Sequence, residues 1–138
     1  MTDAEMSALH SLCFDGTPRA WNAAEFAEYR ADPNVLVCES PFGFLVCRVV
    51  GDQAEILTLA VHPDARRKGE ARALLSEVEA LAQARGAREI FLEVRADNLA
   101  AKALYDSAGY VAAGYRKNYY QAAGRRSSSA IVLKKLLS

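Results

Sequence analysis

The first third of the chain changes from a helical to a strand-like pattern of apolar positions. Residues 2–13 place apolar side chains three or four positions apart, which predicts a helix capped by Thr2 or Asp3. Residues 22–31 predict a second helix, which the proline shortly after it would end. The runs NVLVCE and FGFLVCRVV then predict two paired strands joined at the turn SPFG.

The middle of the chain predicts a strand, a helix and another strand. Residues 54–61, AEILTLAV, are almost continuously apolar, so we expect a central strand covered on both faces and closed by Pro63. A helix follows Gly69 and ends at Gly86. Its apolar stripe consists of Ala71, Leu74, Leu75, Val78, Leu81 and Ala82. The strand expected at 88–94 alternates, with Ile90, Leu92 and Val94 on one face and Phe91 and Glu93 on the other.

The last third of the chain predicts one helix and two closing strands. Asp97 or Asn98 caps the helix, and Gly109 ends it. The runs YVAAGYR and SSAIVLKKLL predict the strands, and we expect the connector KNYYQAAGRR to be polar and mobile. The order of elements predicts a mixed α/β sheet with helices on both faces, in a single domain 1–138. A right-handed crossover would place the two strands in the middle of the chain parallel and adjacent.

Composition and charge exclude several classes of function. The net charge is zero, which argues against nucleic acid as a partner, and no apolar run approaches the ~20 residues that span a membrane. The start, MTDAEM, is acidic and polar, unlike a signal peptide. Cys13, Cys38 and Cys47 are unclustered, so we expect reduced thiols in a cytoplasmic protein. His10 and His62 are too far apart to suggest a metal site.

Three cations, Arg66, Arg67 and Lys68, precede Gly69 at the start of the third predicted helix. The helix dipole disfavours cations there, by ~0.3–1 kcal/mol each when exposed. Either the turn is an ordinary one with solvated charges, or it binds a polyphosphate through its free N–H groups. The patterns GxxxxGK[ST] and GxGxxG are both absent, which excludes a P-loop and a dinucleotide fingerprint.

Two segments resemble the motifs of the GNAT family of N-acetyltransferases. The run LAVHPDARRKGEARALL resembles motif A, [QR]-x-x-G-x-[GA], which Arg66, Gly69 and Ala71 match. Residues 92–110 resemble motif B, N-x-x-A-x-x-x-Y-x-x-x-G-[FY]. The second segment, followed by RKNYY, is most similar to the ribosomal-protein S18 alanine N-acetyltransferases of the RimI type. Thr58 departs from the asparagine often found at this point in that group.

The resemblance implies that acetyl-CoA is the cosubstrate and that backbone N–H groups from Arg67 through Arg72 hold its pyrophosphate. It also implies a mostly antiparallel sheet whose central parallel pair is splayed by a bulge, with the N–H groups there holding the oxyanion. The family's first strand has no counterpart before the first predicted helix. The cofactor-binding residues that the resemblance implies are Leu59, Ala60, Val61, Arg66, Arg67, Lys68, Gly69, Glu70, Ala71, Arg72, Asn98 and Tyr105.

Two residues are candidates for acid–base chemistry. Glu93 is the candidate base, acting directly or through a water, because a carboxylate on a covered sheet would be partly desolvated. Alternatively, it is a solvated glutamate paired with Arg95. Tyr105 is the candidate acid that protonates the leaving thiolate, and alternatively a packing tyrosine. Asn98 is a helix cap, and the resemblance adds a contact with the cofactor.

Three aromatic residues are candidates for contact with the acceptor. Trp21, Tyr119 and Tyr120 either shape an acceptor pocket or pack in the core. Arg125 and Arg126 stand where the similar group usually has an acidic residue, which favours an acidic peptide over an ammonium at that loop.

The sequence therefore predicts an acetyl-CoA-dependent N-acetyltransferase that works by direct attack of an amine and uses no metal. A protein N-terminal α-amine, such as that of ribosomal protein S18, is the leading acceptor, because its pKa of ~7.7–8.0 lies well below the ~10.4 of lysine. The alternatives are a small amine, a lysine side chain, or a non-catalytic acyl-CoA-binding module. We expect a cytoplasmic monomer or weak dimer that binds neither nucleic acid nor membrane.

Overall fold

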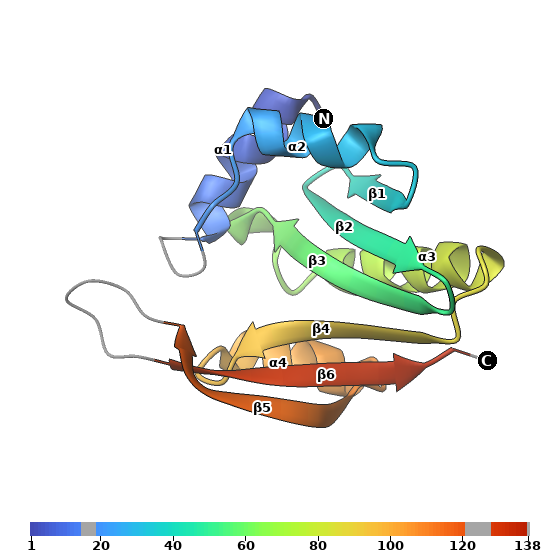
Figure 1. The fold of residues 1–138 in the computed structure, drawn as a ribbon. Coiled ribbons are helices and arrows are strands. Elements are labelled where there is room, and N and C mark those ends of the chain that lie inside the picture. The colour runs from blue at the N-terminus through green and yellow to red at the C-terminus, as the bar shows by residue number, and fades with distance from the viewer. Residues whose placement is uncertain (15–18, 121–127, 138) are drawn as a thin grey trace.

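Six strands form one sheet in the order β1-β2-β3-β4-β6-β5 (Figure 1). The computed structural model describes residues 1–14, 19–120 and 128–137, with the main chain alone for 118–120 and 128. The strands are β1 (Val35–Ser40), β2 (Gly43–Val50), β3 (Gln53–Val61), β4 (Glu89–Arg95), β5 (Val111–Tyr120) and β6 (Ser128–Leu136). The helices are α1 (Asp3–Cys13), α2 (Ala23–Ala31), α3 (Glu70–Ala84) and α4 (Leu99–Ser107), with a short 3-10 helix, Pro63–Ala65, before α3.

Local capping explains where three of the helices begin. The side chain of Thr2 accepts from the N–H of Glu5, and the Glu5 carboxylate accepts from the N–H of Thr2, so α1 starts with a capping box. The side chain of Asn22 caps α2 in the same way. For α4 the cap is Asn98, whose side chain accepts from a first-turn N–H. These starts confirm the predictions from sequence.

The central parallel pair is confirmed, and it is short. β3 pairs with β4 through three residues of each strand only, Gln53–Glu55 with Glu89–Phe91. Beyond that point the two strands diverge, as the left half of Figure 1 shows. A register shift between β2 and β3, after Val46, leaves one extra residue in β3 and marks the β-bulge. The sheet is therefore splayed at its centre.

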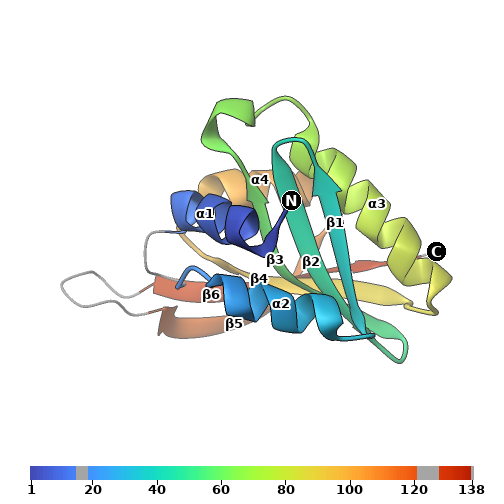
Figure 2. The ribbon, with the colours of Figure 1, turned by 90° about the horizontal axis from the view of Figure 1, so that it is seen from above.

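Helices cover both faces of the sheet, as the expected α/β layering requires. Figure 2 shows α1 and α2 over one face and α3 and α4 over the other. The α3 and α4 side buries the larger apolar cluster, which includes Leu74, Ile90 and Leu92. The α1 and α2 side buries a smaller cluster around Phe26 and Phe44. Apolar burial on both faces of the central strands holds the two halves of the splayed sheet in place.

Three details differ from the sequence predictions or extend them. β5 continues to Tyr120, so KNYY belongs to the strand and not to the connector, because the backbone of Tyr120 pairs with Ser128 of β6. Leu81, expected in the buried stripe of α3, is 41% exposed at the edge of that stripe. Among the described residues no strand precedes α1.

Candidate active site

The turn before α3 is shaped to bind an anion with its backbone. Gly69 is the N-cap residue with φ +80°, in the left-handed region, and it offers no side-chain cap. Arg67 also has a positive φ, +63°. The N–H groups of residues 67–72 have no acceptor among the described residues. An added Cβ at Gly69 would meet nothing within 4 Å, so the space beside the glycine is open. Free donors around an open space at a helix N-terminus fit a phosphate group.

The side chains of this turn point in different directions. The Arg66 guanidinium donates to the carbonyl of Val61 at 3.3 Å and lies 3.5 Å from the Sγ of Cys13. Arg72 reaches α4, where it donates to the Oγ of Ser107 at 2.8 Å. Arg67 and Lys68 are exposed and form no ion pair within the described part of the chain. These two cations remain available to a bound anion.

Glu70 has a structural partner that the sequence did not reveal. Its carboxylate accepts hydrogen bonds from the Oγ of Ser40 and from the N–H of Phe42, at 2.9 Å, in the β1–β2 turn. These bonds, first that of Ser40, hold the pKa of Glu70 below its usual value. The Glu70 side chain therefore ties the β1–β2 turn to the start of α3, and only its backbone N–H is available to a phosphate.

The end of β3 presents backbone donors to the gap beside β4. The N–H of His62 donates to the carbonyl of Phe42, just before β2, at 2.8 Å. Hydrogen bonds to one neighbour alternate along an antiparallel strand, so the N–H of Ala60 also points to β2. The N–H groups of Leu59 and Val61 point the opposite way, toward β4, where the two strands have separated. Of the three expected oxyanion donors, the register thus leaves Leu59 and Val61.

Tyr105 lies inside the molecule, on α4. It is 5% exposed, and its ring meets that of Tyr110 edge-on at 5.4 Å between ring centroids. Burial raises the pKa of Tyr105, which keeps the phenol protonated at neutral pH. A protonated phenol can donate to a developing thiolate. The position also satisfies the packing alternative, since Tyr105 belongs to the larger apolar cluster.

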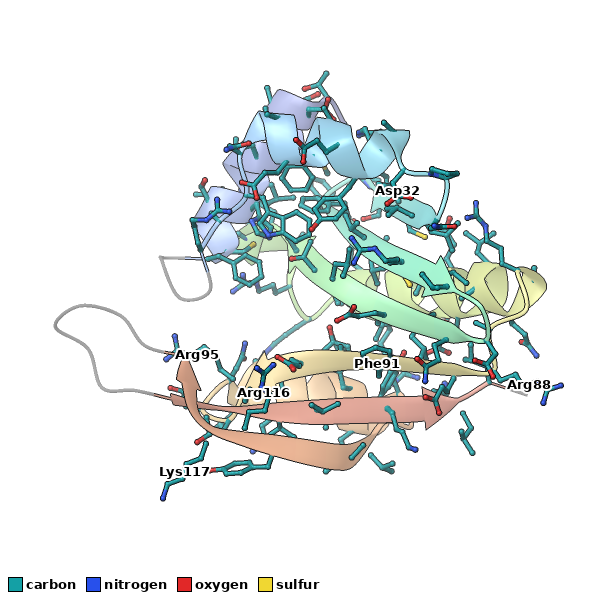
Figure 3. All side chains as sticks on the ribbon, in the orientation of Figure 1. Asp32, Arg88, Phe91, Arg95, Arg116 and Lys117 are labelled. Carbon is teal, nitrogen blue, oxygen red and sulfur yellow. The ribbon has the colours of Figure 1, made fainter. Side chains whose placement is uncertain are left out.

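Glu93 lies on the opposite face of β4 from Ile90 and Leu92, as expected. Its partner is Arg116 of β5, whose guanidinium donates to the carboxylate at 2.8 Å. Arg95, the partner that the sequence suggested, pairs instead with Asp97 at 3.0 Å. The sequence could not indicate Arg116, because that contact joins strands that lie far apart along the chain. In Figure 3 the side chain of Arg116 reaches from β5 toward β4.

A second carboxylate, Glu55, stands near Glu93 and was not singled out by the sequence pattern. Glu55 is half-buried on β3, directly opposite Phe91 of β4, at the last position where the two strands pair. Burial raises the pKa of Glu55; the charge of Arg48 opposes that rise, and the charge of Glu93 adds to it. The signal in the sequence was the charge of Glu55 within a largely apolar strand.

Trp21 lies beside the α1–α2 side of the sheet. Its ring stacks on Tyr29 at 4.6 Å and packs against the smaller apolar cluster. Its backbone N–H donates to the Nδ1 of His10, so the Nε2 of the neutral imidazole carries the proton and donates to the Oγ1 of Thr58 at 2.8 Å. Core packing accounts for every one of these contacts. The side chains of Tyr119, Tyr120, Arg125 and Arg126 lie outside the described residues.

Asn98 acts as the cap of α4, as predicted, with its Oδ1 3.1 Å from the N–H of Ala101.

Among the described residues no group of three potential ligands could hold a metal ion. No helix in the described part of the chain is long and apolar enough to cross a membrane. Cys13, Cys38 and Cys47 are free thiols.

Comparison with known proteins agrees with this arrangement. The model of the Acetyltransferase (GNAT) family matches residues 4–110, so the chain belongs to that family. It is 42% identical over 89 residues to the [ribosomal protein bS18]-alanine N-acetyltransferase of Escherichia coli (strain K12), which is 64% of this chain and 60% of the relative. The protein of that name from Haemophilus ducreyi is 37% identical over 90 residues, 65% of this chain and 62% of the relative. The chain thus spans about three-fifths of the length of these curated relatives.

Solved structures show the same fold over nearly the whole chain. The ribosomal-protein-S18-alanine N-acetyltransferase of Escherichia coli superposes with a TM-score of 0.81 at 30% identity, covering 99% of this chain and 86% of that one. Chaetomium thermophilum Naa20, in complex with a bisubstrate analogue, gives a TM-score of 0.81 at 25% identity, covering 98% and 82%. The expected fold class is therefore confirmed.

Proposed function

We propose that this protein transfers the acetyl group of acetyl-CoA to the N-terminal α-amine of a protein. The observation that supports this proposal most strongly is the row of N–H groups at residues 67–72 that find no acceptor among the described residues. They lie at the start of α3, in the turn that follows the open end of β3. Those donors and the open space at Gly69 suit a diphosphate. Family membership adds acetyl-CoA as the diphosphate-bearing molecule.

The residues around the gap suit acyl transfer to an amine. The N–H groups of Leu59 and Val61 would hold the oxyanion that forms when an amine attacks the thioester carbonyl, and donors of this kind contribute ~2.7–4 kcal/mol. Tyr105 would donate its phenolic proton to the departing sulfur. Glu93 would take the proton that the acceptor's nitrogen loses, directly or through a water. Asn98 and the turn at Gly69 would position the cofactor.

The acceptor is inferred from the relatives and from acid–base chemistry. The E. coli and H. ducreyi relatives are [ribosomal protein bS18]-alanine N-acetyltransferases, and Naa20 was solved with a bisubstrate analogue. An α-amine loses its proton near neutral pH, unlike a lysine side chain. We therefore favour a ribosomal protein of the S18 type, acetylated in the cytoplasm. Trp21, Tyr119 and Tyr120 remain candidates for contact with the peptide.

Release of free thiol from acetyl-CoA tests this function. We expect turnover with peptides that begin Ala-Arg and none with the same peptides carrying an acetylated N-terminus. Turnover with a polyamine but with no peptide would move the acceptor to small amines. Binding of coenzyme A without turnover on any amine would contradict catalysis and favour a binding module.

A further inference from the structure

The β-bulge decides which backbone N–H groups of β3 point away from β2. The register shift after Val46 makes Leu57 the extra residue of β3. Without that residue, the earlier register would continue, and every later residue of β3 would move by one position against β2. Because hydrogen bonds to one neighbour alternate along the strand, the N–H groups of Leu59 and Val61 would then point to β2. The bulge is therefore what frees the two proposed oxyanion donors.

A buried hydrogen bond joins α1 to the bulge. Thr58 follows the extra residue and precedes Leu59, and it lies opposite Val46 on the side of α1 and α2. Its Oγ1 accepts a hydrogen bond at 2.8 Å from the Nε2 of His10 in α1, and both side chains are buried. In Figure 1, α1 reaches down to the end of β3. The hydroxyl of Thr58 thus ties this point of the strand to the helix above it.

The imidazole of His10 is itself held in one orientation. Its Nδ1 accepts a hydrogen bond at 2.8 Å from the backbone N–H of Trp21, so the proton on Nε2 faces Thr58. The carbonyl of Trp21 accepts from the Oγ of Ser7, one turn earlier in α1, at 2.9 Å. One series of hydrogen bonds therefore links α1, the chain before α2 and the bulge of β3.

Packing explains why His10 is buried, and it does not explain why its contact with Thr58 is polar. Aromatic rings surround the imidazole at 4.3–6.2 Å between ring centroids, from Phe14, Trp21, Phe26 and Phe44. Apolar contacts have no direction, so they would accept a strand shifted by one residue if the volumes fit. A one-residue shift would turn the hydroxyl of Thr58 to the other face and leave the buried Nε2–H without a partner. The hydrogen bond therefore favours the bulged register.

We propose that His10 and Thr58 are positioning residues, whose hydrogen bond holds the bulge and thereby directs the N–H groups of Leu59 and Val61 to the thioester carbonyl. The inference rests on the proposed function and adds the side chains that keep the oxyanion donors aligned. Both side chains act through the backbone of β3 and not by contact with a reacting atom.

Kinetics of Thr58 variants test this role, with a peptide beginning Ala-Arg as the acceptor. Thr58→Val keeps the shape and removes the hydroxyl, so kcat should fall about tenfold or more as the donors lose their alignment. KM for the peptide and the calorimetric affinity for coenzyme A should change little. Thr58→Ser keeps the hydroxyl and should restore most of kcat. If Thr58→Val loses its affinity for coenzyme A, Thr58→Ala takes its place with the same expected loss of kcat.

The control is Tyr110→Phe, which removes a hydrogen bond to Glu79 on the α3 side of the sheet. It should lose stability and keep kcat nearly unchanged. A wild-type kcat in Thr58→Val overturns the proposal. An equal loss of kcat in Tyr110→Phe would show a general effect of lost stability, and it overturns the proposal as well.

Infrared spectroscopy of bound acetyl-CoA, isotope-labelled at the acetyl carbonyl, tests the alignment without an acceptor. Two N–H donors polarise the carbonyl and lower its stretching frequency. Thr58→Val should raise that frequency, whereas Thr58→Ser and Tyr110→Phe should keep the wild-type value. The same frequency in all four proteins overturns the proposal. A wild type that binds acetyl-CoA and acetylates no amine would overturn the proposed function instead, and the frequencies still decide the positioning role.

Discussion

At the residue scale, burial decides what the candidate acid can do. A phenol held away from solvent on α4 stays protonated at neutral pH, so it has a proton to give to a departing thiolate. Tyr110, which follows the end of α4 at Ser107, has a different task. Its hydroxyl donates to the Glu79 carboxylate at 2.9 Å, beside Lys135 at 2.8 Å from the same carboxylate. One tyrosine is therefore the candidate acid, and the other ties α3 to the sheet.

Tyr105→Phe should lower kcat about a hundredfold or more, because general-acid help to the leaving group is lost. The affinity for coenzyme A should change little, since the ring remains. The matched control is Tyr110→Phe, which should lower the free energy of unfolding by about 1–2 kcal/mol through the lost bond to Glu79, with kcat nearly unchanged. A fully active Tyr105→Phe enzyme would remove Tyr105 from the mechanism.

His10 gives the fold a dependence on pH. It is 2% exposed, and burial lowers its pKa to about 4 from 6.5. The unfolded chain therefore binds a proton at a pH where the folded protein does not. The free energy of unfolding should be unaffected by His10 above pH 6.5 and should fall as the pH drops from 6.5 toward 4, by on the order of 3 kcal/mol.

Denaturant unfolding measured at several pH values checks this dependence. His10→Gln should flatten the profile between pH 6.5 and about 5, above the range in which ordinary carboxylates titrate. His62→Gln, at the start of the 3-10 helix, is the control and should keep the slope. An unaltered slope in His10→Gln would show that another group is responsible.

Sequence spacing identified Glu93 and Tyr105 because both belong to short motifs. It could not show that Glu55 lies near Glu93, since that proximity comes from the pairing of Glu55 with Phe91 of a later strand. Arg116 was missed for the same reason, because its bond to Glu93 crosses an intervening strand. Residue roles that depend on neighbours from distant segments require the sheet order, which local pattern does not contain.

At the scale of elements, the turn before α3 is the part of the site that the sequence described best. The cations and the glycine are contiguous, so their common position at a helix start follows from the pattern alone. What the pattern did not indicate is the clamp from Glu70 to Ser40 and Phe42, which holds the turn against the β1–β2 hairpin. Such a clamp keeps the N–H groups oriented before any ligand arrives.

Gly69→Asp should abolish binding of coenzyme A, because a carboxylate would occupy the space that the phosphates need. The left-handed φ of Gly69 also adds a backbone cost of about 1–2 kcal/mol. Gly51→Asp is the matched control. Gly51 has φ +62° in the β2–β3 turn and the same open surroundings, so it should bear a similar cost in stability and bind coenzyme A normally. Equal affinity of the two variants would contradict the phosphate cradle.

Element boundaries were predicted well where a local residue decides them and poorly where a distant one does. Thr2, Asn22 and Asn98 cap their helices through bonds to residues three positions away, so the starts could be seen in the sequence. The end of β5 depends on pairing with β6, and the predicted strand was therefore too short. Leu81 fits the helical period of α3 but lies beyond the width of the surface that the sheet covers.

At the scale of the whole molecule, the splayed sheet separates two functions of the fold. The two halves of the sheet are held together where β3 pairs with β4, at Gln53–Glu55 and Glu89–Phe91, and by the apolar clusters on both faces. Beyond the paired segment, the backbone N–H groups of Leu59 and Val61 point into the gap between the two strands. The order of strands and helices could be predicted from the sequence, and the bulge and the splay came only from the family resemblance.

Bound cofactor should stabilise this architecture as a whole, because the ligand contacts only the folded state. At a concentration 100 times Kd, acetyl-CoA should add about 2.7 kcal/mol to the free energy of unfolding. Thermal unfolding with increasing acetyl-CoA measures the effect, and Gly69→Asp should show none of it. A wild-type melting temperature that does not respond to saturating acetyl-CoA would contradict a folded, preformed site.

Calorimetric titration of the purified protein with coenzyme A tests the central claim most directly, since every proposed role depends on the turn at residues 67–72 holding a diphosphate. We predict saturable binding to a single class of site in the wild type and in Gly51→Asp, and its loss in Gly69→Asp. A wild-type protein that produces no binding heat with coenzyme A at any temperature tested, and that leaves the ligand free in equilibrium dialysis, would contradict the account.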